Sequence, residues 1–497
     1  MNELKEIIRK GDGKIVLRIW SNGARWWNLN MKRLFLYIDS DVSDEESASN
    51  QEQLLILRNH LAWSEVAGYR VAKRAIQCYN MKRRKNNQKI VEQERQLLET
   101  RICIPEVIHF NLEANPDLTS QPWALFSYVG EGSSYINDEE DIRLDESSKW
   151  VVCNDLIHNM VKVRHEFGFD EPHPRHGRVN IDQALDYALH VFDTIVLPIH
   201  FAFFDEFYTT YNDGNKHTPM NHFESDLLQK DGCSLIWDWF SYNHNSNRNS
   251  DGLINSNEHR QRPCTYEDMV NFYDIVITNL QNQLRPKKCT EINEVELIQE
   301  RGQNEDNNDK KFEMLIEILG ECVQTLQMES NDFTHIQELP PVLCHIDLQP
   351  QNMILCKNLA FNKNDKEIPK IFSVLDWEES CYADPRFELL LLCRKVVANR
   401  DQANVLWHRY EAFVNEHFGE QVWEHRGYPR GKCNIGSIDP WLKLETVHSI
   451  LTMTIQGMDL GGRSPWEEKP DLFDKISREL MRLESLGWKF CDQFYQN

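Results

Sequence analysis

The first quarter of the chain has the apolar pattern of a few short strands and one helix. The β-branched run at residues 14–20 (KIVLRIW) follows a glycine turn signal and predicts a strand. Two more strands are predicted at 105–110 and 123–129, and the second leads into Gly130-Glu-Gly132, a natural hinge. Between them, apolar residues at helical spacing predict a helix from about residue 54 to residue 75, and the acidic stretch 39–53 predicts a loop.

The remainder of the chain is mostly helical in pattern. Helical periodicity covers 148–210, 311–329, 386–418 and 439–491. Two polar tracts, at about 241–262 and 286–310, predict loops or disordered insertions. We therefore predict an α+β protein with two lobes, a small β-rich lobe at 1–132 that ends in the hinge and a larger helical lobe at 133–497.

Composition narrows the partners and the compartment. A formal net charge of −23 argues against duplex nucleic acid or an anionic membrane surface as the main partner, and it allows a neutral or cationic substrate. The 13 cysteines include no C-x-x-C pair, as expected in a reducing compartment. The first ten residues do not resemble a signal peptide, and charged residues and Pro198 interrupt the apolar stretch 191–207. We expect a soluble, cytoplasmic protein without membrane insertion.

Two short segments carry residues suited to chemistry. In the first (VLCHIDLQPQNMIL, 342–355), a polar loop with Asp347 and Asn352 five residues apart lies between two apolar runs that predict strands. In the second (IFSVLDWE, 371–378), a predicted strand ends on Asp376. Phosphoryl transfer needs one carboxylate to orient an acceptor hydroxyl, and an amide oxygen with a second carboxylate to hold Mg²⁺. The pattern therefore favours a phosphotransferase.

These segments, HIDLQPQN followed by VLDWEESCYADP, resemble the aminoglycoside phosphotransferase family, which is related to choline and ethanolamine kinases and has a bilobal protein-kinase-like fold. The resemblance implies an enzyme that uses ATP and Mg²⁺, with Asp347 as the catalytic residue and Asn352 and Asp376 as metal ligands. It implies structural support from His345 and Asp384. The matching positions are His345, Asp347, Leu348, Pro350, Asn352, Asp376, Trp377, Glu378, Asp384 and Pro385.

The resemblance extends upstream to the nucleotide site. It places Arg18 where a basic residue contacts the ATP phosphates, and Glu65 on the following helix where an acid pairs with that base. It also implies that the backbone of Ser127, Tyr128 and Val129 meets the adenine edge.

The sequence departs from the family pattern at several positions. Ile346 and Gln351 replace glycines, Gln349 replaces a frequent histidine, and Glu388 replaces a frequent aspartate. The resemblance also places residues 2–7 just after the loop that covers the phosphates, so Met1 falls inside or past that loop. This predicts a truncated sequence or a protein that lacks the loop.

Three hypotheses follow from these patterns. The first is a kinase that phosphorylates a hydroxyl of a small molecule; the second is a choline- or ethanolamine-type kinase; the third is a nucleotide-binding or scaffold pseudokinase. Acids and tryptophans near the C-terminus either line a site for a cationic acceptor or, as we favour, form a tryptophan-anchored core with acids on its solvent side. These residues are Asp439, Trp441, Glu445, Asp459, Trp466 and Glu467.

Overall fold

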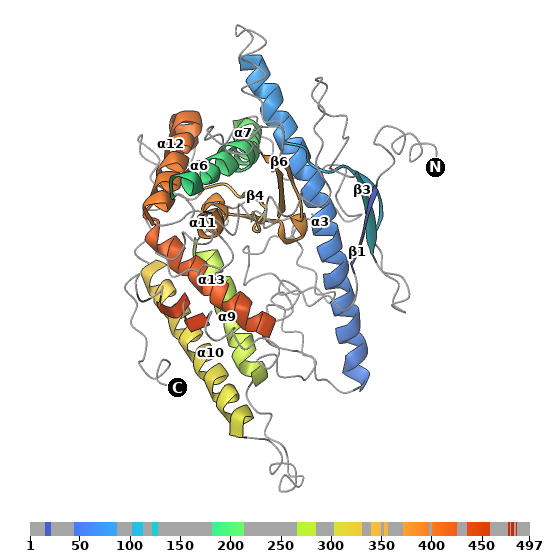
Figure 1. Cartoon of the computed structure of the whole chain (residues 1–497), viewed down its shortest axis with the longest axis vertical. Coiled ribbons are helices and arrows are strands. Elements are labelled where there is room, and N and C mark those ends of the chain that lie inside the picture. Colours follow the sequence, from blue (N-terminus) through green and yellow to red (C-terminus); the bar gives the residue numbers. More distant parts are fainter. Residues whose placement is uncertain are drawn as a thin grey trace. The chain divides into compact units, whose positions relative to one another are not determined.

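The structure is a computed structural model of mixed α/β composition, mostly helical with small sheets (Figure 1). It describes residues 15–20, 44–86, 102–112, 122–127, 181–212, 266–284, 303–330, 339–348, 352–355, 371–396, 400–424, 435–457, 476–477, 479–481 and 484. Its contacts divide the chain into two units. The first contains Met1–Ala24, Arg58–Thr265 and Ile336–Gly436, and the second contains Arg25–Leu57, Tyr266–His335 and Ser437–Asn497. The predicted lobe boundary at residue 132 and the hinge lie outside the described residues.

In the first unit, three short strands form an antiparallel sheet. They are β1 (Ile15–Ile19), β2 (Val107–Asn111) and β3 (Trp123–Ser127), in the order β1-β3-β2. Arg18 of β1 lies opposite Ala124 of β3 in the register. The three strands predicted from the apolar runs are therefore confirmed. β1 is one residue shorter than predicted at each end, β2 begins two residues later and ends one residue later, and residues 128–129 of the third predicted strand lie outside the described residues.

Helix α3 (Asp44–Asn86) is longer at both ends than the predicted helix. Its middle section buries small and β-branched side chains, including Ala62, Val66, Val71 and Ala75. The predicted loop at 39–53 is wrong from residue 44 onward. That segment is rich in Glu, Gln and Ser and has no apolar stripe, but Glu and Gln are good helix formers and acids favour a helix N-terminus.

A long helical segment of the first unit packs through aromatic rings. It consists of α6 (Ile181–Val191), the π-helical turn η2 (Phe192–Val196) and α7 (Leu197–Asn212). The ring centroid of Phe192 lies 6.0 Å from that of Tyr410, and the ring centroid of Phe201 lies 5.5 Å from that of Phe418. Tyr410 and Phe418 belong to α12 (Arg400–Glu424). The predicted helical pattern at 148–210 is confirmed for residues 181–210, and its earlier part lies outside the described residues.

Part of this segment is apolar enough to resemble a membrane span. Within the described residues, one stretch, Ala188–Glu206, is long and apolar enough to cross a membrane by length and composition, with a mean hydropathy of 1.3. Of this stretch, 61% is buried inside the structure. Buried core helices of soluble proteins meet the same criteria of length and composition, so one such stretch is weak evidence for a membrane span.

The buried His200 of α7 is expected to make the stability of this unit depend on pH. Its Nδ1 lies 3.1 Å from Tyr410 Oη, and burial lowers the pKa of His200 to about 3. Because the folded pKa is below the unfolded value of about 6.5, the contribution of the neutral ring is present above that pH and is lost as the pH falls. We expect His200 to reduce the free energy of unfolding by up to about 1.4 kcal/mol per pH unit below pH 6.5.

The check is urea unfolding of the wild type and the His200→Gln variant between pH 7 and pH 5. The variant should lose less stability over this interval than the wild type. His408→Gln, at a side chain that is 74% exposed on α12, is the matched control and should retain the wild-type pH dependence. Equal pH dependence of wild type and His200→Gln would contradict the assignment.

Two small antiparallel ladders in the first unit position the chemistry-bearing segments. β4 (Val342–Cys344) pairs with β7 (Cys381–Ala383), and β5 (Met353–Leu355) pairs with β6 (Ile371–Val374). The short turn η6 (Trp377–Glu379) connects β6 to β7, and α11 (Pro385–Val396) follows β7. The two short strands predicted at the ends of 342–355 are confirmed, and residues 349–351 of the loop between them lie outside the described residues. The helical pattern predicted at 386–418 is two helices, α11 and α12.

The second unit contains α9 (Tyr266–Leu284), α10 (Gln303–Ser330) and α13 (Asp439–Gly457). Helices α9 and α10 pack against each other, and α13 contacts both. Met269, Tyr273, Val276 and Leu280 of α9 recur at helical spacing and are fully buried. The predicted insertion at 286–310 is wrong from residue 303 onward, because an apolar helix that has already nucleated extends over adjacent polar residues at little cost.

Candidate active site

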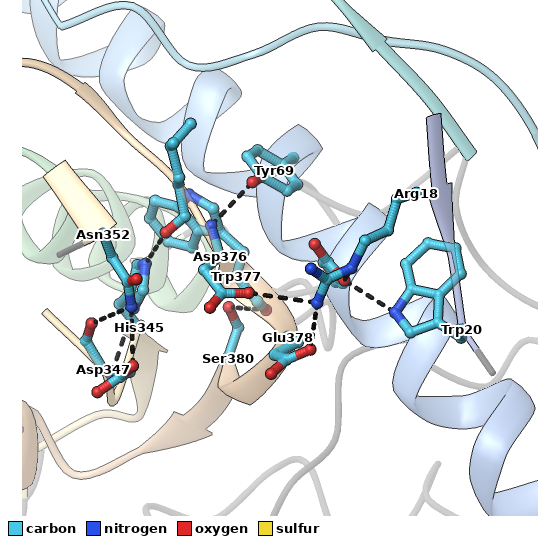
Figure 2. A network of polar contacts seen from close by, with 12 residues as sticks. Arg18, Trp20, Tyr69, His345, Asp347, Asn352, Asp376, Trp377, Glu378 and Ser380 are labelled. Atoms are coloured by element: carbon cyan, nitrogen blue, oxygen red, sulfur yellow. Dashed lines mark hydrogen bonds and ion pairs between the residues drawn. The ribbon is translucent and has the colours of Figure 1, made fainter. Parts of the chain in front are cut away.

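The polar loop after β4 is closed by hydrogen bonds between its own residues (Figure 2). Asn352 Nδ2 donates to the Asp347 main-chain carbonyl at 2.9 Å and to Asp347 Oδ2 at 2.8 Å. The Asp347 amide donates to His345 Nδ1 at 3.3 Å. The two ends of the predicted catalytic segment are therefore joined, and the Asp347 carboxylate is held in one orientation.

Ile346, between the histidine and the aspartate, has φ of 69°. A β-branched residue is rarely found in this left-handed region, whereas glycine adopts it readily. This backbone geometry is the physical reason why a glycine suits the position. Here the Ile346 amide donates to Glu388 Oε2 at 3.0 Å, and both residues are buried. The buried carboxylate of Glu388 thus helps to hold a strained main chain.

Strand β6 ends at Val374, two residues before the predicted strand end at Asp376. Asp376 is connected to the same loop through the main chain of Leu375. The Leu375 amide donates to the Asn352 carbonyl at 2.8 Å. The Leu375 carbonyl accepts a hydrogen bond from His345 Nε2 at 2.8 Å. The structure therefore brings His345, Asp347, Asn352 and Asp376 together as one connected group.

Arg18 of β1 lies among three carboxylates (Figure 2). Its Nε is 3.4 Å from Glu65 Oε2 of α3, and one terminal nitrogen is 3.5 Å from Asp376 Oδ1. The same nitrogen is 2.6 Å from Glu378 Oε2, the shortest of the three contacts. The predicted pairing of Arg18 with Glu65 is thus present as a contact, and Glu378 is an additional partner that sequence reasoning missed.

Burial and crowding raise the pKa of all three carboxyl groups. Burial is the largest cause in each, and it raises the pKa of Glu65 to about 8 and that of Glu378 to about 7, with Arg18 opposing the rise. The pKa of Asp376 is also raised by burial and by the charge of Asp347, again against Arg18. Burial lowers the pKa of Arg18, but the three acids outweigh it and raise this pKa above its usual value. This group of side chains thus contains three carboxyl groups and only one guanidinium to neutralise them.

This surplus of buried acid suits a divalent cation. Asp376 offers a carboxylate, and Asn352, whose amide nitrogen is held by Asp347, has an amide oxygen to offer. Among the described residues, no group of three or more His, Cys, Asp or Glu side chains is placed to hold a metal ion. Mg²⁺ bound together with a nucleotide needs only one or two carboxylates, because phosphates and water supply the other oxygens. Asn352 and Asp376 therefore fit Mg²⁺ as partners of a nucleotide.

Helix α3 packs unusually closely on the segment after Asp376. A Cβ atom at Gly68 would lie 2.7 Å from Ser380 Oγ and 3.0 Å from Trp377 Cβ. Ser64 Oγ donates to the Ser380 carbonyl at 3.0 Å. Because Gly68 has no side chain, the helix that carries Glu65 can approach the backbone that carries Asp376 and Glu378.

Of the other predicted site residues, the structure describes only some. The Ser127 amide already donates to the Glu106 carbonyl at 2.8 Å, so it is engaged within the β-lobe. Tyr128 and Val129 lie outside the described residues, and their predicted contact with adenine stays a prediction. Asp384 is fully buried and makes a two-pronged contact with Arg386, at 2.8 and 2.5 Å, next to the loop.

In the second unit, the C-terminal acids and tryptophans are partly described. Trp441 and Glu445 of α13 are both fully buried. The tryptophan core that we favoured is therefore present around Trp441. The expectation that its acids face solvent is wrong for Glu445, since one helical turn separates it from Trp441 on the same face. Asp459, Trp466 and Glu467 lie outside the described residues.

Sequence reasoning missed several residues that surround the site. Trp20 Nε1 donates to Glu65 Oε2 at 2.9 Å, and both side chains are buried. Tyr69 Oη accepts a hydrogen bond from the Asp376 amide at 2.8 Å. One signal was available for Tyr69: it lies four residues after Glu65 and therefore on the same face of the helix.

A family model covers the segment that carries most of this site. Residues 287–424 match the model of the Phosphotransferase enzyme family (APH), and this segment contains Asp347, Asn352 and Asp376. The resemblance inferred from the sequence is confirmed for this segment. No curated protein matches the sequence. A chain described as "Structure of the GDP and kanamycin complex of APH(2")-IIia" is similar over 83% of each chain, with 12% identity and a TM-score of 0.29.

Proposed function

Since residues 287–424 carry the sequence of the phosphotransferase enzyme family, we propose that the protein is a kinase that transfers the γ-phosphate of ATP to a hydroxyl group of a small molecule. The single observation that best supports this is the closed loop, in which Asn352 holds the carboxylate of Asp347 while Asn352 and His345 also hold the strand end that carries Asp376. Three groups needed for phosphoryl transfer are thereby kept in fixed relative positions.

Asp347 acts on the acceptor in this proposal. Its carboxylate orients the acceptor hydroxyl and takes the proton as the hydroxyl oxygen bonds to the γ-phosphorus. The bond from the γ-phosphorus to the bridging oxygen breaks, and its electron pair leaves with ADP. Most of the rate enhancement comes from holding the reacting groups in line and from stabilising charge.

Asn352, Asp376 and Arg18 act on the phosphates. Asn352 and Asp376 would hold Mg²⁺, which would neutralise part of the negative charge of the phosphates when bound. The guanidinium of Arg18, positioned by Glu65, would donate to phosphate oxygens in a planar, two-pronged way. A nucleotide would therefore compete with Glu378 for Arg18, whose contact with Glu378 is the shortest of its three ion pairs.

The acceptor is proposed only as a class. The acidity of the chain, with a net charge of −23, favours a neutral or cationic hydroxylated molecule over an anionic one. A cytoplasmic location, where ATP, Mg²⁺ and reduced cysteines coexist, is part of the same proposal.

The test is binding followed by turnover. We expect ATP with Mg²⁺ to raise the thermal midpoint of the full chain, because a ligand at 100 times its Kd adds about 2.7 kcal/mol of stability. Labelled phosphate should then move from γ-labelled ATP to one class of acceptor in a panel of aminoglycosides, choline, ethanolamine and sugars, with GTP as the alternative donor. Transfer to choline or ethanolamine would assign the second hypothesis. Binding without transfer would indicate a scaffold, and absence of both would contradict the proposal.

A further inference from the structure

The peptide that joins Leu375 to Asp376 is held by side chains from two different parts of the first unit. The Leu375 carbonyl accepts from His345 Nε2 of the polar loop at 2.8 Å. The amide of Asp376, on the other edge of the same peptide, donates to Tyr69 Oη of helix α3 at 2.8 Å. Figure 2 shows Tyr69 directed at this main chain from the side of α3. One peptide plane is therefore fixed at both edges.

Asp376 needs such support because of its backbone conformation. Its φ of 62° and ψ of 60° are left-handed. A residue other than glycine pays roughly 1–3 kcal/mol in this region and stays there only when its surroundings impose it. If one of the two supports is removed, only the other restrains the peptide, so it can rotate further and the direction of the Asp376 carboxylate becomes less defined.

The ring of Tyr69 is itself fixed by packing. It is buried, with its centroid 4.9 Å from the ring of Phe126 on β3 and 6.3 Å from the ring of Trp377 on η6. The hydroxyl therefore has a defined position, set by the β-sheet on one side and by the segment after Asp376 on the other. Glu65, the partner of Arg18, lies one helical turn earlier on the same helix.

We propose that Tyr69 is a positioning residue, whose hydroxyl fixes the main chain of Asp376 and thereby orients the carboxylate that would hold Mg²⁺. The metal-binding role of Asp376 in this inference rests on the proposed function. The hydrogen bond between Tyr69 and the Asp376 amide, and its effect on the peptide, are independent of that function. Through Tyr69 and Glu65, one face of α3 positions both Asp376, which would bind the metal, and Arg18, which would bind the phosphates.

The test removes one oxygen atom and leaves the ring. In Tyr69→Phe, the packing on Phe126 and Trp377 is retained, and only the acceptor for the Asp376 amide is lost. Tyr79→Phe, ten residues further along α3, is the matched control: its ring packs against Phe201 at 5.4 Å on α7, away from the Asp376 peptide.

Three measurements are made on wild type and both variants, as full chains. The first is amide hydrogen exchange of peptides that cover residues 375–377, without nucleotide. The second is Mn²⁺ binding, followed by electron paramagnetic resonance with a non-hydrolysable ATP analogue. The third is the thermal midpoint. We expect Tyr69→Phe to speed exchange at Asp376 and to weaken Mn²⁺ binding about tenfold or more, as losses of outer contacts to metal ligands do. Tyr79→Phe should match the wild type in exchange and in Mn²⁺ binding.

The outcomes separate the inference from the proposed function. Unchanged exchange at Asp376 in Tyr69→Phe, or fast exchange at Asp376 in the wild type, would overturn the inference whatever the activity of the protein. Faster exchange with Mn²⁺ affinity within twofold of the wild type would also overturn it, because the peptide would then have moved without affecting the metal. A wild type that binds no Mn²⁺ with nucleotide would instead contradict the proposed function.

Discussion

Replacing Asp347 by asparagine is expected to lower the rate of phosphate transfer by about 10²–10⁴-fold, the usual loss when a positioned acid–base group is removed. The variant keeps the shape of the side chain and one oxygen that can still accept a hydrogen bond from Asn352 Nδ2. In the wild type this nitrogen lies 2.8 Å from Asp347 Oδ2. The loop should therefore stay closed. What is lost is the negative charge that orients the acceptor hydroxyl and takes its proton.

The measurement is transfer of labelled phosphate to the acceptor found in the panel, together with the Kd for ATP and Mg²⁺. Nucleotide affinity should stay within a few-fold of the wild type, because Asp347 is not one of the groups assigned to the metal or the phosphates. Asp186→Asn, at an exposed aspartate of α6, controls for the loss of one charge and should be fully active. If Asp347→Asn retains a third or more of the wild-type rate, the role assigned to Asp347 is wrong.

The second large effect is expected on stability, from the buried ion pair beside the loop. Asp384 and Arg386 are almost completely inaccessible, and the guanidinium contacts both carboxylate oxygens at 2.8 and 2.5 Å. In Asp384→Ala the buried guanidinium loses its counter-charge, which typically destabilises a protein by about 3–5 kcal/mol. Asp384 also accepts from the Arg386 amide at 2.9 Å at the start of α11, and loss of this helix cap adds about 1 kcal/mol.

Chemical unfolding checks this prediction against a surface pair of the same residue types. Arg409 contacts both carboxylate oxygens of Asp193 at 3.0 and 3.1 Å, but both side chains are about half exposed. Because solvent screens such a pair, Asp193→Ala should change stability by no more than about 1 kcal/mol. The double variant Asp384→Ala with Arg386→Met should be more stable than the sum of the two single changes, since no unpaired charge stays buried. Equal effects of Asp384→Ala and Asp193→Ala would contradict the prediction.

Errors in predicting the helices have a common physical cause. The start of α3 at Asp44 and that of α10 at Gln303 both lie in polar segments that were predicted to be loops. An apolar stripe reveals only the part of a helix that packs on a core. A polar extension is held by backbone hydrogen bonds and helix propensity, which leave no hydrophobic pattern.

The sequence by itself determined the chemistry-bearing loop of this protein. His345, Asp347 and Asn352 lie within eight residues, between two strands that can be recognised locally, and Asp376 follows the next strand by two residues. Hydrogen bonds over such short separations, as between Asn352 and Asp347, follow from the local chain path once the strands form. That is why the motif alone was enough to indicate a phosphotransferase and to find the matched family.

Only the tertiary structure decided what surrounds that loop. Arg18 meets Glu378 across 360 residues of chain, and Tyr69 meets Asp376 across 307, so no local pattern could indicate either contact. The left-handed backbone at Ile346 is likewise held by Glu388, 42 residues away, against the preference of a β-branched residue. Contacts of this kind depend on how α3 and β1 pack on the loop, and packing is a property of the folded chain as a whole.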